Sequence, residues 1–571
     1  MRRAGAAPAE PDMSAPLSSR GGLTRRLLTG LLLLPGAVLA QGRPTTVATA
    51  PNVGGFGAPQ TVTSFSPVYN DDSNTDMQAY SILYTPLIWP SPVITVDWKL
   101  GLAESVHYNR QRTVVTVKLK PRRWTDGTPV TAADVVYTWK LIEQQGRSYG
   151  LYGVGGMPYV IRQAQAISAD TVRFTLKHPV SEHWFTLNAL SQLYPLPAKA
   201  WGQHSNTYFR NHETDMQLMR VSDGPYRLDR FVPGRYARFS VNPYYPGKLP
   251  VRHFELRFFT DWTTQFSALK TGELQIGEIP TPLYSARRLV AHLPSYANAP
   301  GKAGFYPYEF RMIRLNFRNP KIAFMRDETV RQALQMTIPQ QAIIDVVFHG
   351  LGAASFTAVP PVPDTYLSPS MKALDEHPNR EYDPAKAARL LDQDGWKVHD
   401  GVRAKDGKRL EFTLLYLTGS RAQTEEADML KASWQKLGVM VHLKRMPQAT
   451  LLATVRSGKS EAAMLLWAYA PNMYPSGDGL FNASGVLASG FHDAALDTAI
   501  NASIQPHGRE ALWHYEALLA KQLPVLFLPV PGYQVRHDAC LSGMRDYLNP
   551  AAYIAPQALR WKTSGSCMQH S

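Results

Sequence analysis

Short segments rich in β-branched residues alternate with amphipathic helical segments along most of this chain. Residues 114–119, 172–176, 236–241 and 254–259 have the pattern of strands. Residues 132–144 have the pattern of a helix that lies between two of them. Alternation of this kind predicts an α/β fold with mixed or parallel sheets. The chain has 571 residues, which is more than one ordinary core accommodates and predicts two or three domains.

Capping residues predict where several helices begin and end. Thr131 is expected to cap the helix that follows it, with Asp134 completing a capping box. Thr337 is expected to cap another helix, with Pro339 in its first turn and Gly350 just past its end. Further helices are predicted over residues 261–270, 327–336, 383–395, 421–437 and 510–522, and strands over residues 412–417 and 439–444.

The N-terminal segment has the pattern of a secretory signal peptide. Arg25 and Arg26 precede an uncharged stretch from Leu27 to Ala40, whose last residues suit a signal peptidase. An apolar run of about 14 residues is too short for a permanent transmembrane helix. We therefore expect residues 1–40 to be removed after about Ala40 and the mature chain to lie outside the cytoplasmic membrane. No Cys stands at the cleavage point, so a lipid anchor there is not expected.

The chain carries a basic surplus. It has 60 Lys and Arg residues against 45 Asp and Glu residues, a net charge of +15. Residues 1–40 hold five of the basic and two of the acidic residues, which leaves +12 on residues 41–571. A basic balance favours partners such as nucleic acid or a membrane surface. Because the charges form no run of five or six, we interpret the surplus as solvated surface and expect no nucleic-acid partner.

Cys540 and Cys567 are the chain's two cysteines. In an oxidising compartment, an even pair near one terminus predicts a disulfide. Two buried free thiols remain the alternative.

Several motif matches lack the context that their chemistry requires. Gly458-Lys459-Ser460 resembles the end of a phosphate-binding loop, but Ala453 replaces the first Gly and the preceding residues have helical periodicity. Ser267 and Lys270 have the Ser-x-x-Lys spacing of penicillin-binding enzymes, but the Lys-Thr-Gly motif overlaps it here instead of lying far away. No metal-ligand spacing and no nucleophile–base pattern stands out. We expect no catalytic residue, metal or cofactor; an exported α/β enzyme of the hydrolase type remains the alternative.

The segment from Trp124 to Trp139, Trp-Thr-Asp-Gly-Thr-Pro-Val-Thr-Ala-Ala-Asp-Val-Val-Tyr-Thr-Trp, resembles the signature of the extracellular solute-binding proteins of oligopeptide and dipeptide ABC importers. Other segments resemble that family in the same order along most of the mature chain. They are Leu83–Leu87, Leu102–Ser105, Gly224–Leu228, Asn242–Tyr245, Leu269–Ile276, Val330–Leu334 and Tyr382–Leu391.

The resemblance implies a two-lobed periplasmic-binding-protein fold with mixed sheets, a hinge and an extra domain inserted in the first lobe. The first lobe would comprise residues 41–90, 210–310 and 526–571, the inserted domain residues 91–209, and the second lobe residues 311–525. Ligand contacts split between two lobes stabilise a closed form that a membrane permease can recognise. The resemblance therefore implies a monomeric, non-enzymatic component of an ABC importer that captures a peptide or a similar mid-sized solute.

The resemblance also points to the segment that follows Trp467 as a ligand-binding region. In peptide-binding members, a Trp-x-Ala-Asp-Tyr-x-x-Pro segment supplies an Asp for the ligand's α-ammonium group, which needs a paired carboxylate when it is partly desolvated. Ala470 stands at that position here, and the next carboxylate is Asp478. Either Asp478 or another acid replaces this anchor, or the ligand has no free α-amine and is an opine, an oligosaccharide or a metal chelate.

Aromatic walls with a few polar groups suit a sizeable ligand of mixed polarity. The predicted ligand-binding residues are therefore Trp467, Tyr469, Asn472 and Tyr474, with Tyr416 from the strand 412–417. The alternative that Trp467 and Tyr416 are ordinary core aromatics stays open.

Overall fold

The computed structural model describes residues 46–69, 73–482, 485–487, 489–563 and 567. The predicted signal peptide, residues 1–40, lies outside these described residues. Within them, no helix has both the length and the apolar character needed to cross a membrane.

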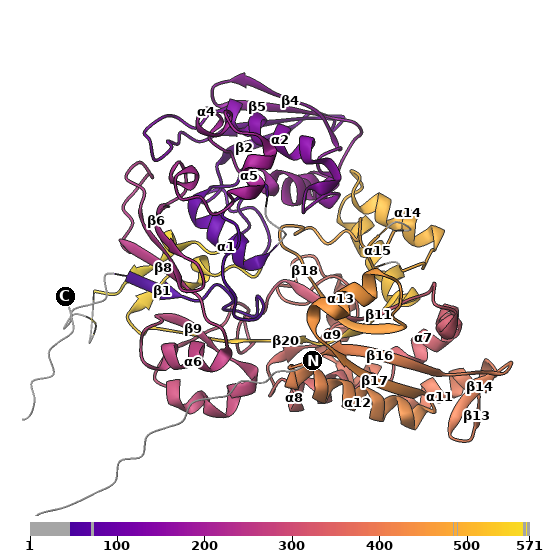
Figure 1. The fold of residues 1–571 in the computed structure, drawn as a ribbon. Coiled ribbons are helices and arrows are strands. Elements are labelled where there is room, and N and C mark those ends of the chain that lie inside the picture. The colour runs from indigo at the N-terminus through magenta and orange to yellow at the C-terminus, as the bar shows by residue number, and fades with distance from the viewer. Residues whose placement is uncertain (1–45, 70–72, 483–484, 488, 564–566, 568–571) are drawn as a thin grey trace, which may run out of the picture. The chain divides into compact units, whose positions relative to one another are not determined.

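The largest sheet has seven strands in the order β10-β21-β9-β1-β8-β7-β6. Figure 1 labels four of them, β6, β8, β1 and β9. Its central strand β1 runs parallel to β8 and β9, and the outer pairs are antiparallel, so the sheet is mixed. Helix α6 (Trp262–Lys270) connects β8 to β9 and begins at Asp261, whose carboxylate accepts from the N–H groups of the first turn. The strands are β1 (Thr46–Thr49), β6 (Tyr226–Val232), β7 (Tyr236–Val241), β8 (His253–Arg257), β9 (Ile276–Ile279), β10 (Ser295–Tyr296) and β21 (Gln534–His537).

A second sheet is antiparallel throughout and comes from one continuous part of the chain. Its order is β2-β3-β5-β4, and helix α2 (Ala132–Gln145) packs on it. The predicted capping box is present, because the N–H of Thr131 donates to Oδ2 of Asp134 at 2.8 Å. The strands are β2 (Ala103–Tyr108), β3 (Val114–Leu119), β4 (Ile161–Ser168) and β5 (Thr171–Leu176).

A third sheet has five strands in the order β17-β16-β18-β11-β19. Strand β16 runs parallel to β17 and β18, and β11 runs antiparallel to β18 and β19. Helix α12 (Arg421–Leu437) is the crossover between β16 and β17 and ends at Gly438, which has a left-handed conformation with φ of 85°. The strands are β11 (Glu309–Leu315), β16 (Glu411–Leu417), β17 (Met440–Met446), β18 (Ala462–Ala468) and β19 (Val525–Leu528).

Smaller elements complete the fold. The helices are α1 (Asn74–Leu83), α3 (Glu182–Trp184), α4 (Ala198–Trp201), α5 (Asn206–Asn211), α7 (Glu328–Gln335), α8 (Gln340–Val346), α9 (Pro369–Glu376), α10 (Pro378–Glu381), α11 (Pro384–Gln393), α13 (Gln448–Arg456), α14 (Ala494–Ser503), α15 (Arg509–Gln522) and α16 (Met544–Tyr547). The remaining strands are β12 (Gly352–Ala353), β13 (Lys397–His399), β14 (Val402–Lys405), β15 (Lys408–Arg409), β20 (Val530–Pro531), β22 (Leu541–Ser542) and β23 (Arg560–Trp561). Buried apolar side chains from all three large sheets belong to one contiguous cluster. The predicted lobe and insertion boundaries stay a prediction.

One predicted helix start is wrong. Helix α8 begins at Gln340, directly after Pro339, so Thr337 does not cap it. The hydroxyl of Thr337 instead donates to the carbonyls of Ala333 and Leu334, in the last turn of α7. The hydroxyl of a Thr between two helices can hydrogen-bond to the backbone of either helix. Here it donates to carbonyls of the helix that precedes it.

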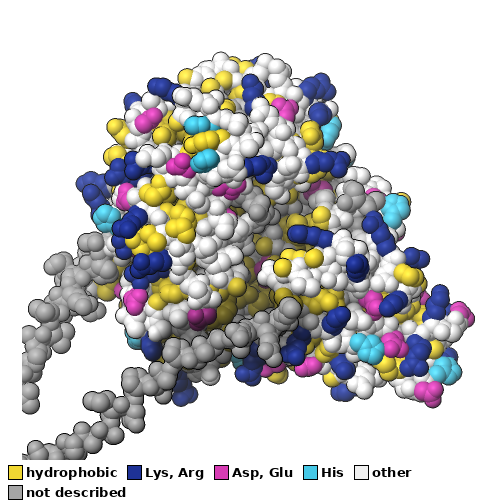
Figure 2. All heavy atoms as spheres, in the orientation of Figure 1, with side chains coloured by type: hydrophobic (Ala, Val, Ile, Leu, Met, Phe, Trp, Pro, Cys, Tyr) yellow, Lys and Arg dark blue, Asp and Glu magenta, His cyan; other side chains and the backbone are white. Residues whose placement is uncertain are grey.

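Charged side chains do not gather in one basic patch on the face that Figure 2 shows. Lys and Arg side chains are spread over it, with Asp and Glu between them. This distribution agrees with the interpretation of the surplus as solvated surface charge.

The predicted disulfide is present. Cys540 and Cys567 are bonded, with their Cα atoms 5.6 Å apart and a sequence separation of 27. Inside the loop that the bond closes, the short strands β22 and β23 pair antiparallel.

Removing this bond is expected to lower stability. A loop of this size predicts a loss of about 3–4 kcal/mol in the free energy of unfolding for the double variant Cys540→Ser/Cys567→Ser, because the unfolded chain gains conformational freedom. Guanidinium chloride unfolding followed by circular dichroism measures the change. Dithiothreitol should destabilise the parent protein and leave the double variant unchanged; equal stability of the two proteins without reductant would contradict the expectation.

Candidate functional site

Strand β18 leads into the segment in which four of the five predicted ligand residues lie. Trp467 and Asn472 line a cavity of about 310 Å³, together with Asp478 and with residues 150–154 of a distant loop. We call it the Trp467 cavity. Nε1 of Trp467 and Oδ1 of Asn472 are buried and have no hydrogen-bond partner among the described residues. A donor and an acceptor are therefore free to pair with polar groups of a ligand, because a buried polar group without a partner is costly.

The three predicted tyrosines are packed in the interior. Tyr469 is fully buried, and its hydroxyl donates to the carbonyl of Ala358 at 2.9 Å. The backbone of Tyr474 is held by the side chain of Asn188, through hydrogen bonds of 2.7 and 3.0 Å. Tyr416 lies on β16 and belongs to the core cluster. The ligand-binding roles of these tyrosines, and of Trp467 and Asn472, stay predictions.

Asp478 lines the Trp467 cavity but already has partners. Nε1 of Trp184 lies 3.1 Å from both of its carboxylate oxygens, and the hydroxyl of Ser476 donates to one of them. Burial raises the pKa of this carboxyl group, and these hydrogen bonds oppose the shift. Asp478 therefore ties its loop to α3, and both contacts come from neutral donors.

A second cavity, of about 420 Å³, meets the first at Leu466, which lines both and is 52% exposed. We call it the Glu309 cavity. Its walls come from loops of the seven-stranded sheet and from β11, β18 and the start of α12. They include Gly55, Trp262, Glu278, Glu309, Arg311, Phe348, Arg421, Gln423, Pro531 and Tyr533. None of these residues was singled out from the sequence as a ligand-binding residue.

Glu278 on β9 is held against the backbone of a glycine turn. Its Oε2 accepts from the N–H groups of Gly54 and Gly55 at 2.7 and 3.2 Å. Gly55 has a φ of 84°, and a Cβ at this position would lie 2.2 Å from the ring of Tyr533, so only glycine fits. Burial raises the pKa of Glu278 to about 7, although both hydrogen bonds favour the ionised form.

Glu309 is the first residue of β11 and is 3% exposed. Its Oε1 has no hydrogen-bond partner among the described residues. Burial raises the pKa of Glu309 to about 8, and the nearby charge of Arg311 opposes the shift. Arg311 is itself engaged by Glu426 of α12, through two hydrogen bonds of 3.0 and 2.6 Å.

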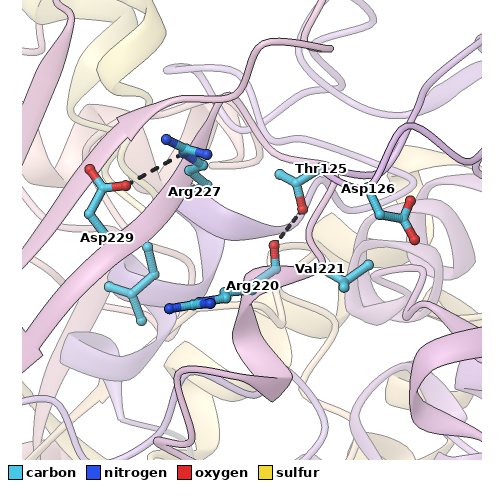
Figure 3. A pocket seen from close by; sticks show the side chains of 7 residues that line it. Thr125, Asp126, Arg220, Val221, Arg227 and Asp229 are labelled. Carbon is cyan, nitrogen blue, oxygen red and sulfur yellow. Dashed lines mark hydrogen bonds and ion pairs between the residues drawn. The ribbon is translucent and has the colours of Figure 1, made fainter.

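A third hollow, of about 390 Å³, lies beside β6 and the turn that contains Asp126 (Figure 3). Its polar groups pair with one another: Arg227 lies 3.5 Å from Asp229, and the hydroxyl of Thr125 donates to the carbonyl of Arg220. The carboxylate of Asp126 accepts from the N–H and hydroxyl of Thr128 within its own turn. Because the side chains of Arg227, Asp229, Thr125 and Asp126 already have partners, the hollow is a weaker candidate than the two cavities that Leu466 lines.

The chain is similar to solute-binding proteins of known structure and sequence. The oligopeptide-binding protein AppA of Bacillus subtilis is 24% identical over 440 residues, which are 76% of each protein. The nickel-binding periplasmic protein of Escherichia coli is 24% identical over 450 residues, 76% of this chain and 78% of that protein. The crystal structure of NikA from Brucella suis in complex with Fe(III)-EDTA has a TM-score of 0.71 at 20% identity, covering 90% of this chain and 100% of that chain.

The structural match confirms the predicted fold class, a mixed α/β fold of the two-lobed periplasmic-binding-protein type. Residues 97–485 match the sequence model of the bacterial extracellular solute-binding proteins, family 5 Middle. This match covers more than half of the chain, and the chain therefore belongs to the family 5 extracellular solute-binding proteins of bacteria.

Proposed function

We propose that this protein is the periplasmic substrate-binding component of an ABC importer, and that it captures a peptide or a similar mid-sized solute in the adjoining Trp467 and Glu309 cavities. The observation that carries the proposal is that residues lining both cavities have buried polar atoms without a hydrogen-bond partner in the part of the chain that the structure describes. These atoms are Nε1 of Trp467, Oδ1 of Asn472 and Oε1 of Glu309. Binding sites for small molecules combine apolar walls with a few such groups, which fix the ligand's orientation.

A peptide fits this combination better than a bare apolar ligand. Its backbone offers carbonyl acceptors to the N–H of Trp467 and N–H donors to the carbonyl of Asn472. Leu466, which lines both cavities, adds an exposed apolar surface. Support also comes from relatives whose names include oligopeptide binding, while the nickel-binding relative makes a metal chelate the main competing ligand class.

The proposal includes export and delivery to a membrane permease. Expression of the full chain should yield a periplasmic protein whose N-terminus is at or near Gln41, as determined by N-terminal sequencing. Family 5 proteins are extracellular, and the sequence pattern of residues 1–40 supports export. A protein that keeps residues 1–40 and stays in the cytoplasm would overturn this part of the proposal.

Native mass spectrometry tests the ligand class directly. The mature chain, purified gently, is offered a pool of peptides of two to five residues, and ion mobility follows its shape. We expect peptides to be retained and the collision cross-section to fall, because ligand contacts to both lobes stabilise a closed form. Refusal of every peptide, with a co-purified mass of another class still bound, would overturn the peptide assignment and identify the ligand.

A further inference from the structure

A glutamate that lines the Glu309 cavity has a buried carboxylate oxygen to which no described residue donates a hydrogen bond. Glu309 lines the cavity, is 3% exposed and has an Oε1 without a partner among the described residues. Its charged neighbour Arg311 directs both terminal nitrogens to Glu426, and one of them also to the carbonyl of Pro529 at 3.1 Å. A buried carboxylate in this state costs free energy unless a cation pairs with it.

The charges around the cavity leave an acidic excess. Glu278 enters from β9 as a second buried carboxylate, and Arg311 is balanced by Glu426. Arg421 also lines the cavity, but its side chain is 77% exposed and lies 2.7 Å from Glu425. Once Glu278 and Glu309 are ionised, no described cation in the cavity wall is left to neutralise them.

The register of the sheet places Glu309 beside the segment that was expected to supply an anchor for an amine. Glu309 lies directly opposite Ala468, and Arg311 directly opposite Leu466. Directly opposed residues of antiparallel strands project to the same face. Glu309 and Leu466 therefore project to the same face of the sheet. Glu309 lies beside Ala468, two residues before Ala470, where no carboxylate is available.

We propose that Glu309, assisted by Glu278, receives a cationic group of the ligand, either an α-ammonium group or a basic side chain. The inference rests on the proposed function and adds the substrate class, a ligand that carries a positive charge. The ligand's N–H donors would satisfy Oε1 of Glu309 in a charge-assisted hydrogen bond. Asp478, which already accepts from Trp184 and Ser476, is then not needed as the anchor.

The first test uses a small cation, so that it does not depend on the whole ligand. Butylguanidinium and butylammonium are compared with neutral butyramide at equal ionic strength, and the thermal unfolding midpoint is measured. The cations should raise the midpoint of the parent protein and butyramide should not. Glu309→Gln should weaken cation binding at least about tenfold, since it removes a hydrogen bond to a charged group.

Matched variants separate this role from general effects on charge or folding. Glu143→Gln removes one exposed carboxylate from α2, which lines neither cavity, and should bind the cations like the parent. Glu278→Gln provides a second variant in the cavity if Glu309→Gln folds poorly, and it should also weaken binding. Absence of any cation-selective shift, or an unchanged shift in both cavity variants, overturns the inference.

The pH dependence of cation binding is a second readout. Butylguanidinium stays charged throughout the neutral range, so only the protein titrates. Because Glu309 has a pKa of about 8 and Glu278 of about 7, affinity should rise with pH through this window and level off above it. The other groups that interact with Glu309, namely Arg311 and Tyr533, should not reverse this direction, because Arg311 stays charged and burial raises the pKa of Tyr533 far above this window. Affinity that falls as the pH rises would contradict the proposal.

Peptide pools then distinguish the two sources of charge. Pools with free and with acetylated N-termini, each with and without Lys and Arg, are offered to the parent and to Glu309→Gln. If the parent prefers peptides with free N-termini and Glu309→Gln does not, Glu309 binds the α-ammonium group. If the parent prefers peptides with Lys or Arg and the variant does not, Glu309 binds the basic side chain. If peptides bind regardless of charge, this inference fails and the proposed function stands. If the cations bind through Glu309 and no peptide does, the inference stands and the peptide assignment fails.

Discussion

Replacing Glu426 with Gln is expected to lower the free energy of unfolding by about 3–5 kcal/mol, the cost of breaking a buried ion pair by removing one partner. The side chains of Arg311 and Glu426 are 7% and 0% exposed and are joined by two parallel hydrogen bonds. The variant would leave the guanidinium charge of Arg311 in the interior without its carboxylate. Urea unfolding followed by circular dichroism measures the loss.

The neighbouring residue offers a matched control. Glu425 pairs with Arg421 at 2.7 Å, but these side chains are 37% and 77% exposed. Exposed pairs of this kind contribute about 0.3–0.5 kcal/mol, so Glu425→Gln should scarcely change stability. If Glu425→Gln and Glu426→Gln lower the free energy of unfolding equally, burial does not account for the contribution of the Arg311–Glu426 pair.

The Glu426 variant also has a functional consequence. Arg311, released from Glu426, would be attracted to Glu309, two residues away on the same face of β11. That new pairing would compete with a cationic ligand. The same variant should therefore bind butylguanidinium more weakly than the parent, which a binding isotherm at fixed pH can show.

Replacing Arg331 with Met is expected to lower the free energy of unfolding by about 2–4 kcal/mol, because it leaves buried carbonyl groups unpaired. Arg331 lies on α7, is 3% exposed and donates to the carbonyl of Met325 at 2.7 Å. It also donates to the carbonyl of Gln522, at the end of α15, at 2.9 and 2.7 Å. One side chain thus joins segments that are 191 residues apart in sequence.

Two further variants make this prediction specific. Arg331→Lys should recover only part of the loss, since a compact ammonium group does not reproduce the fork of donors. Arg389→Met removes an exposed Arg from α11 and should change stability by less than about 0.5 kcal/mol. Thermal and urea unfolding of all three variants give the comparison. Full stability of Arg331→Met would mean that these carbonyls need no guanidinium donor.

Arg331 lies in one of the segments that resemble the family. The segment Val330–Leu334 contains no ligand-lining residue of either cavity. Its Arg instead holds α7 to the end of α15. A segment that identifies a family can therefore report packing rather than ligand binding.

Local features of the fold were predictable from the sequence alone. The strand at residues 114–119 and the helix at residues 421–437 have the predicted bounds. Gly438 ends that helix, and Thr131 with Asp134 forms the predicted capping box. The helix end and the capping box depend on hydrogen bonds between residues a few positions apart, so the local sequence contains the necessary information. The strand pairs with β2 and with the distant strand β5, but its β-branched residues make it recognisable in the sequence. The disulfide was also predictable, because the chain offers two cysteines and one pairing.

The binding region was only partly predictable. Four ligand-binding residues are predicted in the segment around the end of β18. Trp467 and Asn472 line a cavity, whereas Tyr469 and Tyr474 are packed in the interior. Nothing in a linear sequence distinguishes an aromatic side chain in a cavity wall from one in the core. The difference depends on which distant segments pack against it.

The amino-acid sequence predicted the family, the α/β fold class and the disulfide, which are confirmed, and an export signal, which stays a prediction. Only the tertiary structure revealed the acidic character of the Glu309 cavity. Glu278 meets Gly54 across 224 residues of chain, and Arg311 meets Glu426 across 115. A Glu in a sequence is normally a solvated surface residue, and it becomes a candidate ligand anchor only when distant segments bury it and leave its carboxylate without a partner.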